Sequence, residues 1–330
     1  VKHLIDTVTQ VNRSEDGSLA SVDTGEHGTV EADFFVDCTG FAGLLIGRSM
    51  EVPFISYNDA LFNDRAVTLP TPQVTADHGL SSETLSGAMK HGWLFKIPLT
   101  NRFGNGYVYC SAYCSAEDAE AELRDKLNLH DESIQARHLK MRVGRRERCW
   151  EKNCLAVGLS QGFIEPLEAT ALFLVAATVE DFVATYERGS TDAKVRATFN
   201  DKISGMFDGV RDYVFMHFKL NTRADTPYWR DCRDANACSD LVEEFLRVWD
   251  HDGDIGHVLD LLKANGQRLV YTPTSWVCML AGMGRFPSGA KKPRANQQVV
   301  DPKVAYRHCE EFVRQFPDHR QALAALQATA

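Results

Sequence analysis

The stretch CLAVGLSQGFIEPLEATALFLV, residues 154–175, decides the fold. Residues 154–158 form an apolar run that ends at a glycine, which is typical of a buried strand. A glycine-containing loop follows, and a strongly apolar helix is expected to begin near Thr170. The apolar positions of this helix recur at helical spacing, and they are Leu172, Val175, Val179 and Phe182. This order of strand, loop and helix delivers one carboxylate, Glu168, to the start of a helix.

The start of this helix is a candidate anion site. Free backbone N–H groups and the positive end of the helix dipole attract a small anion there, and we expect the amides of Thr170 and Ala171 to hold it. Glu168 would sit beside the anion, partly desolvated and available for proton transfer. The alternative is that Glu168 only caps the helix, a common role of acids in a first turn. Taken alone, the pattern favours the capping role.

The rest of the sequence indicates an α+β or α/β protein with two domains or lobes. We expect four regions along the chain: strands of one domain, a second lobe of sheet and loops, a return to the first domain through a strand and a helix, and a mostly helical part. These regions are residues 1–50, 51–150, 151–188 and 189–330.

Several local patterns support this division. An alternating segment at residues 3–11 predicts a strand already under way near Val1, and an apolar run ends at Thr39-Gly40. Residues 93–98 and 106–113 alternate like paired strands. Further helices are expected over residues 115–129, with Ser115 as the N-cap, and over four later segments. Those segments are residues 193–213, 240–249, 258–264 and 304–316.

Composition excludes several classes of protein. The formal net charge is −9 and the pI is about 5.7, so the chain has no general attraction for nucleic acid or anionic lipid. The longest mostly apolar stretch, residues 169–179, is too short for a membrane span, which needs roughly 20 residues. Residues 1–30 carry no secretory signal. We therefore expect a cytoplasmic protein; a homodimer is compatible with its acidic surface.

The cysteines favour neither disulfides nor a metal. There are nine of them, with no C-x-x-C pair and no Cys/His block at zinc spacing. We expect reduced thiols and no metal ligands. The sequence also contains no G-x-G-x-x-G, G-x-S-x-G or H-E-x-x-H motif.

Ordered motifs give the chain a resemblance to a known family. PLEATA at residues 166–171 resembles the P-L-E-S-T-G segment of the flavin-dependent tryptophan halogenases. Further segments agree in order and spacing with the D-C-S-G-F turn, the W-x-W-x-I-P signature and other patterns of that family. They are DCTGF at 37–41, WLFKIP at 93–98, GNGYVY at 104–109, WEKNC at 150–154, TPYWR at 226–230 and SW at 275–276.

The resemblance implies a fold and a mechanism. The fold would be a partial FAD-binding domain of the flavin-monooxygenase (p-hydroxybenzoate hydroxylase) type, with a strand-containing substrate lobe and a helical C-terminal region. A separate flavin reductase would supply FADH2, which reacts with O2 to give a flavin hydroperoxide. Chloride or bromide would attack it, and the resulting hypohalous acid would pass through a channel to a small aromatic substrate such as tryptophan or an indole.

The family's functional positions map onto residues of this chain. Glu168 matches the catalytic glutamate, and Thr170 with Ala171 match the backbone pair that binds halide. A stiff channel wall would come from Trp93, Phe95, Ile97 and Pro98. The cofactor-binding positions would be Val1, near the adenine end, with Thr39, Gly40, Gly158, Leu159 and Leu172.

The departures from the family pattern carry expectations of their own. Its channel lysine and G-x-G-x-x-G motif would lie in an N-terminal portion outside these 330 residues, so we expect this chain alone to bind FAD poorly and not to halogenate. Phe95 replaces the second signature tryptophan, and Ala169 and Ala171 replace Ser and Gly. Phe95 weakens the case for free tryptophan and leaves room for indoles, pyrroles or phenols. Two alternatives stay open: a flavin-dependent monooxygenase or reductase, and a non-catalytic fragment.

Overall fold

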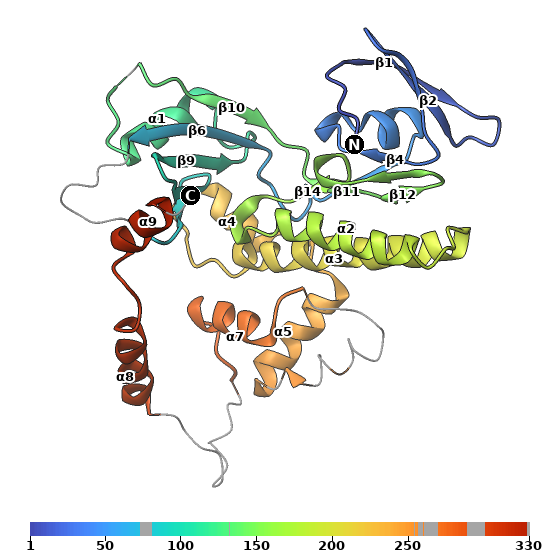
Figure 1. Ribbon diagram of the computed structural model, residues 1–330. Helices are drawn as coiled ribbons and strands as arrows, with labels where there is room; N and C mark the ends of the chain where they lie inside the picture. The colour runs from blue at the N-terminus through green and yellow to red at the C-terminus, as the bar shows by residue number, and fades with distance from the viewer. Residues whose placement is uncertain are drawn as a thin grey trace.

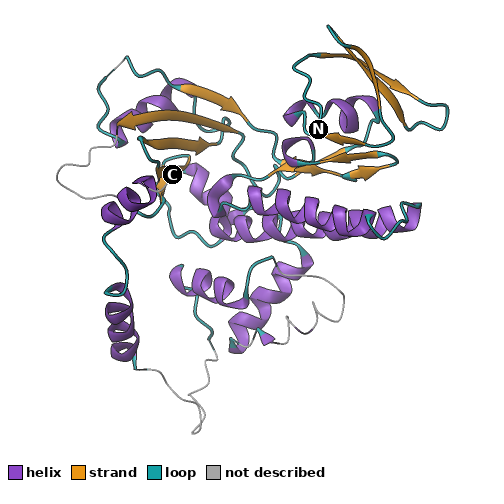
Figure 2. Ribbon diagram, viewed as in Figure 1, coloured by secondary structure: helices purple, strands orange, loops and turns teal. Residues whose placement is uncertain are grey.

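The computed structural model describes residues 1–328 apart from 73–80, 132, 254, 257–259, 261–269 and 289–300. Figure 1 shows a group of short N-terminal strands and a larger sheet, with two long helices running past both and further helices toward the C-terminus. Strands and helices are segregated along much of the chain, as the colours of Figure 2 make plain. The helix expected over residues 258–264 lies almost entirely outside the described residues.

The N-terminal strands form an antiparallel meander. β1 (Val8–Arg13), β2 (Leu19–Thr24) and β3 (Gly28–Glu31) pair in sequence order, and Asp16 accepts a hydrogen bond from the Ser18 amide in the first turn. The expectation of a strand near Val1 is wrong: β1 begins only at Val8, and Val1 is fully exposed. Alternation in the first seven residues has no neighbouring strand to pair with, so the pattern there carries no strand.

A parallel strand pair joins two distant parts of the sequence. β4 (Phe35–Asp37) pairs in parallel with β13 (Cys154–Ala156), and β12 (Trp150–Glu151) lies antiparallel on the other side of β13. The Val157 amide donates to the Asp37 carbonyl at 3.0 Å and extends the pairing. The carboxyl ends of β4 and β13 therefore meet at one edge, where ligands bind in α/β sheets.

The larger sheet has five antiparallel strands. Their order is β10 (Arg137–Lys140), β6 (Arg65–Pro72), β9 (Arg102–Tyr109), β8 (Gly92–Pro98) and β7 (Leu85–Met89). β8 and β9 are the paired strands that alternation predicted, with Trp93 opposite Val108. Leu94 packs toward α1 (Ala116–Lys126) on one face, whereas Trp93 joins the main core on the other. Ser115 caps α1 as expected, accepting from the Asp118 amide at 3.0 Å.

Two long helices form a hairpin against the core. α2 (Ala171–Tyr186) and α3 (Ala193–Lys219) pack together, and Asp192 caps α3 by accepting from two amides. Leu174 and Thr178 are the buried positions of α2. The apolar residues predicted by helical spacing do not all face the core. Val175 and Phe182 pack on the core, whereas Leu172 and Val179 are exposed.

Beside this hairpin lies a small sheet, in which the side chain of Arg146 packs closely against the backbone of Gly47. The sheet consists of β14 (Gly162–Phe163), β11 (Gly144–Arg146) and β5 (Phe54–Ser56). The buried Arg146 donates to the Val52 carbonyl at 3.0 Å and lies against Gly47, where an added Cβ would come within 2.0 Å of its guanidinium. Glycine at position 47 therefore makes room for the side chain of Arg146.

The C-terminal helices are α4 (Pro227–Asp234), α5 (Asp240–Asp252), α7 (Pro273–Gly282), α8 (Pro302–Val313) and α9 (His319–Ala328). α4 packs into the main core, α5 and α7 build a second core against α3, and α8 and α9 bury no residue. Tyr213 and Met216 of α3 pack with Phe245 of α5 and Trp276 of α7. Of the described helices, none is both long and apolar enough to cross a membrane.

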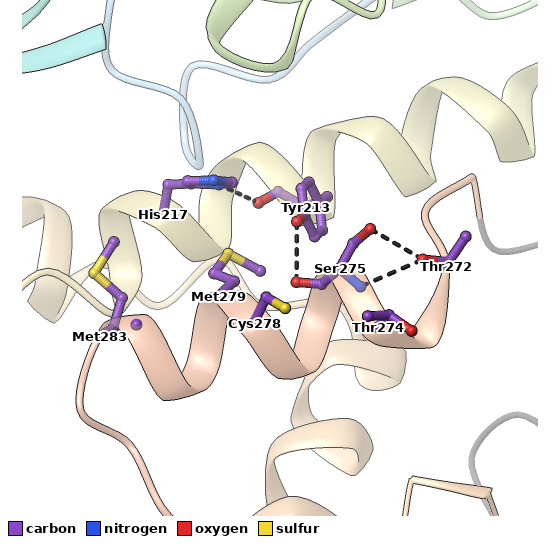
Figure 3. A pocket seen from close by; sticks show the side chains of 9 residues that line it. Tyr213, His217, Thr272, Thr274, Ser275, Cys278, Met279 and Met283 are labelled. Atoms are coloured by element: carbon purple, nitrogen blue, oxygen red, sulfur yellow. Dashed lines mark hydrogen bonds between the residues drawn. The ribbon is translucent and has the colours of Figure 1, made fainter. Parts of the chain in front are cut away.

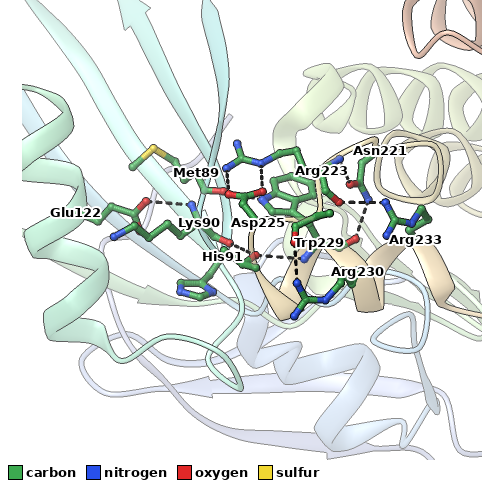
Figure 4. A network of polar contacts seen from close by, with 12 residues as sticks. Met89, Lys90, His91, Glu122, Asn221, Arg223, Asp225, Trp229, Arg230 and Arg233 are labelled. Atoms are coloured by element: carbon green, nitrogen blue, oxygen red, sulfur yellow. Dashed lines mark hydrogen bonds and ion pairs between the residues drawn. The ribbon is translucent and has the colours of Figure 1, made fainter.

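Hydrogen bonds at the turn between β7 and β8 attach the five-stranded sheet to the helices (Figure 4). The Trp229 indole N–H donates to the Met89 carbonyl at 2.8 Å, and the Thr226 hydroxyl donates to the Lys90 carbonyl at 2.8 Å. Arg223 pairs with Asp225 on the exposed side of the same network. Both connections, of which only the bond from Trp229 is buried, come from α4 or its N-cap, so this short helix attaches the sheet to the helical part.

Candidate functional site

The carboxyl ends of β4 and β13 bring four of the expected flavin-contacting residues together. Thr39 and Gly40 directly follow β4, and Gly158 with Leu159 begin the turn after β13. The two turns are in contact, and the Ser160 hydroxyl donates to the Asp37 carbonyl between them. The structure therefore brings these four residues together at the carboxyl ends of β4 and β13, and their contact with a flavin stays a prediction.

Asp37 organises the turn after β4. It is fully buried, and its Oδ1 accepts from the amide and hydroxyl of Thr39 at 2.9 and 2.6 Å. Its Oδ2 accepts from the amides of Leu45 and Ile46 at 2.9 and 2.8 Å. Four donors on one carboxylate hold the chain in a fixed bend, so Asp37 positions the loop rather than facing a ligand.

The start of α2 offers amides without a side-chain cap. Thr170 is the N-cap residue, but its side chain makes no capping hydrogen bond. Thr170 and Ala171 line a pocket of about 170 Å³ together with Leu159 and Leu172. Orphan amides at a helix start satisfy the requirement for binding a small anion. The residues of this pocket come from both the turn after β13 and the first turn of α2.

The same edge has the character that an isoalloxazine ring and a halide require. Leu159 and Leu172 are 42% and 81% exposed, so this edge presents two large apolar side chains beside uncapped amides. A flat, mostly apolar ring could cover them while the amides hold the halide. The chain's donor set therefore fits the flavin and halide that the resemblance implies.

Glu168 lies on a short 3-10 turn, Pro166–Glu168, directly before α2. It does not cap α2: its Oε1 lies 2.8 Å from Nε2 of His217 on α3 instead. Ala169 adopts a left-handed backbone with φ of 54°, which turns the chain between Glu168 and the helix. Ala171 is helical, so replacing the family's glycine there does not strain the backbone.

A large open pocket lies beside this pair (Figure 3). It has a volume of about 540 Å³ and runs between α3 and α7. Tyr213 donates from its hydroxyl to the Ser275 carbonyl at 3.2 Å, and its ring stacks on Tyr271 at 3.6 Å. The lining residues are Tyr213, His217, Thr272, Thr274, Ser275, Cys278, Met279, Gly282 and Met283. This aromatic and sulfur-rich surface suits a flat aromatic molecule.

A second carboxyl group, Glu165, is completely buried three residues before Glu168. Its Oε2 accepts from the Trp93 indole N–H at 2.7 Å and from the Asn63 amide at 2.8 Å, while Oε1 has no hydrogen-bond partner. Burial raises the pKa of Glu165 to about 7, and the hydrogen bonds and nearby His217 only partly offset that rise. Glu165 therefore titrates in the neutral range.

The predicted channel residues do not share one environment. Trp93 is buried in the core and bound to Glu165, and its ring lies 5.9 Å from that of Phe95, which is half-buried. Ile97 is 37% exposed near the end of β8, next to Pro98. Trp93 thus works as a core residue, whereas Phe95 and Pro98 are half-buried and Ile97 is exposed.

Sequence reasoning missed Glu165 and His217. The pattern E-P-L-E offered a signal for Glu165, because a second acid three residues earlier falls on the same short turn. No local signal pointed to His217, which reaches Glu168 only through the packing of α3 against the loop. Among the described residues there is no cluster of metal-ligating side chains, and all nine cysteines are free.

Comparisons with known proteins point to one family. A family model described as tryptophan halogenase matches residues 1–298. Tryptophan 6-halogenase SttH from Streptomyces toxytricini is 40% identical over 249 residues, covering 76% of this chain and 47% of its own length. Tryptophan 7-halogenase RebH from Lentzea aerocolonigenes is 34% identical over 310 residues, covering 91% of this chain and 58% of its own length.

Solved structures show the same mixed α/β fold. The crystal structure of SttH superposes with a TM-score of 0.85 at 34% identity, covering 98% of this chain and 63% of that chain. BrvH, a flavin-dependent halogenase from Brevundimonas sp. BAL3, gives a TM-score of 0.81 at 32% identity, covering 97% of this chain and 64% of that chain. The chain thus spans about half the length of the curated relatives it matches.

Proposed function

Because the chain belongs to the tryptophan halogenase family, we propose that it forms the halide-binding and substrate-binding part of a flavin-dependent halogenase. The substrate would be an electron-rich aromatic such as tryptophan or an indole, and the product would carry chlorine or bromine. The observation that supports this most is the uncapped start of α2, where the residues of two amides line a pocket and a carboxylate lies just before the left-handed residue that leads into the helix.

The flavin and the protein would have separate roles in the reaction. Reduced flavin from a separate reductase, together with O2, supplies the oxidising power that makes the halogen electrophilic. The amides of Thr170 and Ala171 would hold the halide with little competing charge, because backbone donors at a helix start bind an anion without a lysine. Leu159 and Leu172 would cover one side of the flavin ring and exclude water.

The aromatic substrate would occupy the pocket between α3 and α7. Met279, Met283 and Cys278 offer apolar and sulfur contacts, and Ser275 and Thr272 offer polar groups at one end. Glu168 would accept the proton that leaves the ring carbon after halogen addition, since its carboxylate is partly exposed and lies 2.8 Å from His217, which lines this pocket. Phe95 in place of the second signature tryptophan leaves the choice among indoles, pyrroles and phenols open.

The Glu168→Gln variant of the full-length protein tests this role. Losing a general base is expected to lower halogenation by roughly 10²–10⁴-fold while flavin oxidation continues. Product is measured by mass spectrometry and flavin oxidation by absorbance. Glu180→Gln is the matched control, because Glu180 is exposed on α2 away from its first turn.

Three results would count against the proposal. Halogenation by Glu168→Gln within about twofold of the wild type would remove Glu168 from the reaction. A product heavier by one oxygen rather than one halogen would favour a monooxygenase. No product at all from the wild type with FADH2, O2 and bromide, for any of several indoles, pyrroles and phenols, would favour a non-catalytic protein.

A further inference from the structure

The helix that carries His217 fixes which of its two ring nitrogens carries a hydrogen. Nδ1 of His217 lies 2.9 Å from the carbonyl oxygen of Tyr213, one turn earlier on α3. A carbonyl oxygen only accepts hydrogen bonds, so Nδ1 must carry a hydrogen. The second ring nitrogen, Nε2, is thereby the one that faces Glu168.

The Nε2 atom of His217 makes an ion-pair contact with Glu168. The distance from Nε2 to Oε1 is 2.8 Å. Because Nδ1 already carries a hydrogen, protonation at Nε2 gives the imidazolium, whose positive charge attracts the Glu168 carboxylate. This attraction holds the carboxyl group toward α3. Among the hydrogen bonds and ion pairs of the described residues, Oε2 of Glu168 has no protein partner.

The surroundings keep the imidazole in place. The Tyr213 ring meets the His217 ring edge-on, with centroids 5.2 Å apart and planes at 79°. The His217 side chain is only 20% exposed, and that of Glu168 is 32% exposed. The titratable groups that face His217 from the neighbouring elements are Glu168 and the buried Glu165 on the loop before α2, Tyr213 on α3, and Cys278 on α7.

We propose that His217 is a positioning residue for Glu168, which it holds by Oε1 so that Oε2 is free to take the proton from the substrate. This inference rests on the proposed function. With a carboxylate and an imidazolium, the ring C–H bond of the halogenated substrate breaks and its electron pair restores aromaticity. The proton goes to Oε2, so that Glu168 becomes a carboxylic acid and His217 stays the imidazolium.

The first arm of the test is a spectroscopic measurement on the 330-residue chain. With ¹⁵N-labelled histidine, His217 is expected to show a protonated Nδ1, and Glu168→Gln is expected to shift the Nε2 signal while leaving Nδ1 protonated. The matched control is His138, whose Nε2 lies 2.9 Å from Glu120 in a more exposed pair; its signals should not respond to Glu168→Gln. An unprotonated Nδ1, or an Nε2 signal unchanged by Glu168→Gln, would overturn the proposal.

The second arm is activity of the full-length protein. His217→Phe is expected to lower halogenated product by roughly 10²-fold with flavin oxidation unchanged, and His217→Gln, which keeps a donor toward Oε1, should recover part of it. His138→Phe should leave product formation unchanged. Product from His217→Phe within about twofold of the wild type would refute the positioning role even though the halogenase function stood. If the wild type itself forms no halogenated product, the proposed function fails, and the spectroscopic arm alone decides the positioning.

Discussion

At the scale of single residues, Glu165 carries the clearest consequence of burial. It is a carboxyl group without contact to water, held by Trp93 and Asn63, with one oxygen unpartnered. Burial raises the pKa of Glu165 from its usual 4.5 to about 7. Between these two values the unfolded chain has released the proton while the folded chain keeps it, so stability falls as pH rises.

Glu165→Gln should remove this pH dependence. Below pH 4.5 Glu165 is protonated in both the folded and the unfolded chain, so its burial does not lower the stability of the wild type. From pH 4.5 to about pH 7 the free energy of unfolding of the wild type falls, on the order of 3 kcal/mol, relative to that of the variant. Urea unfolding at pH 5 and pH 8 measures the difference, with the exposed Glu180→Gln as control. A constant difference between Glu165→Gln and the wild type at both pH values would show that Glu165 is ionised throughout.

Some residues of the candidate site could be predicted from the sequence, and others could not. Glu168, Thr170 and Ala171 could be singled out because they follow one another on a strand, loop and helix. His217 could not, since its approach to Glu168 depends on how α3 packs. The capping role that the local pattern favoured for Glu168 is wrong, because its carboxylate turns toward α3 instead of the amides of α2.

At the scale of elements, the turn after β4 depends on one buried carboxylate. Asp37→Asn keeps the size of the side chain but replaces one acceptor oxygen with a donor, which would face either two backbone amides or the two donors of Thr39. A loss of about 1–3 kcal/mol in the free energy of unfolding is expected from the unsatisfied donors. Chemical denaturation measures it, and Asp33→Asn, at an exposed position, is the control. Equal stability of Asp37→Asn and the wild type would mean that the turn is held by other contacts.

Element boundaries followed from the sequence where local chemistry defines them. Ser115 caps α1, and α2 begins directly after Thr170, because caps and apolar spacing act within one turn. Which side of α2 is buried did not follow, since Leu172 and Val179 have the right spacing yet face outward. The strand expected near Val1 failed for a related reason: strand formation needs a partner, and residues 1–7 have none.

At the scale of the whole molecule, α4 connects the five-stranded sheet to the helical part. Trp229→Phe removes the indole N–H that reaches the Met89 carbonyl and leaves a buried acceptor without its donor. We expect a loss of about 1–3 kcal/mol in the free energy of unfolding. Tyr186→Phe, at an exposed aromatic position, should change stability by less than about 0.5 kcal/mol. If Trp229→Phe is as stable as its control, this hydrogen bond does not hold the lobes together.

The overall division into strand-rich and helical parts followed from periodicity, and the mixed α/β fold agrees with the halogenase structures. The two apolar runs that form β4 and β13 could be recognised as strands, but their parallel pairing did not follow from the sequence, because the runs lie far apart along the chain. The pocket between α3 and α7 was not foreseeable, because its walls come from helices whose contacts are set only by the complete core.

The most direct measurement is anomalous diffraction from crystals of the chain soaked in bromide. We expect a bromide peak within hydrogen-bond distance of the amides of Thr170 and Ala171. In a crystal of the Thr170→Pro variant, which lacks one of these amide donors, we expect weaker or absent density. Bromide bound at other surfaces, with none at the start of α2, would contradict halide binding by these amides.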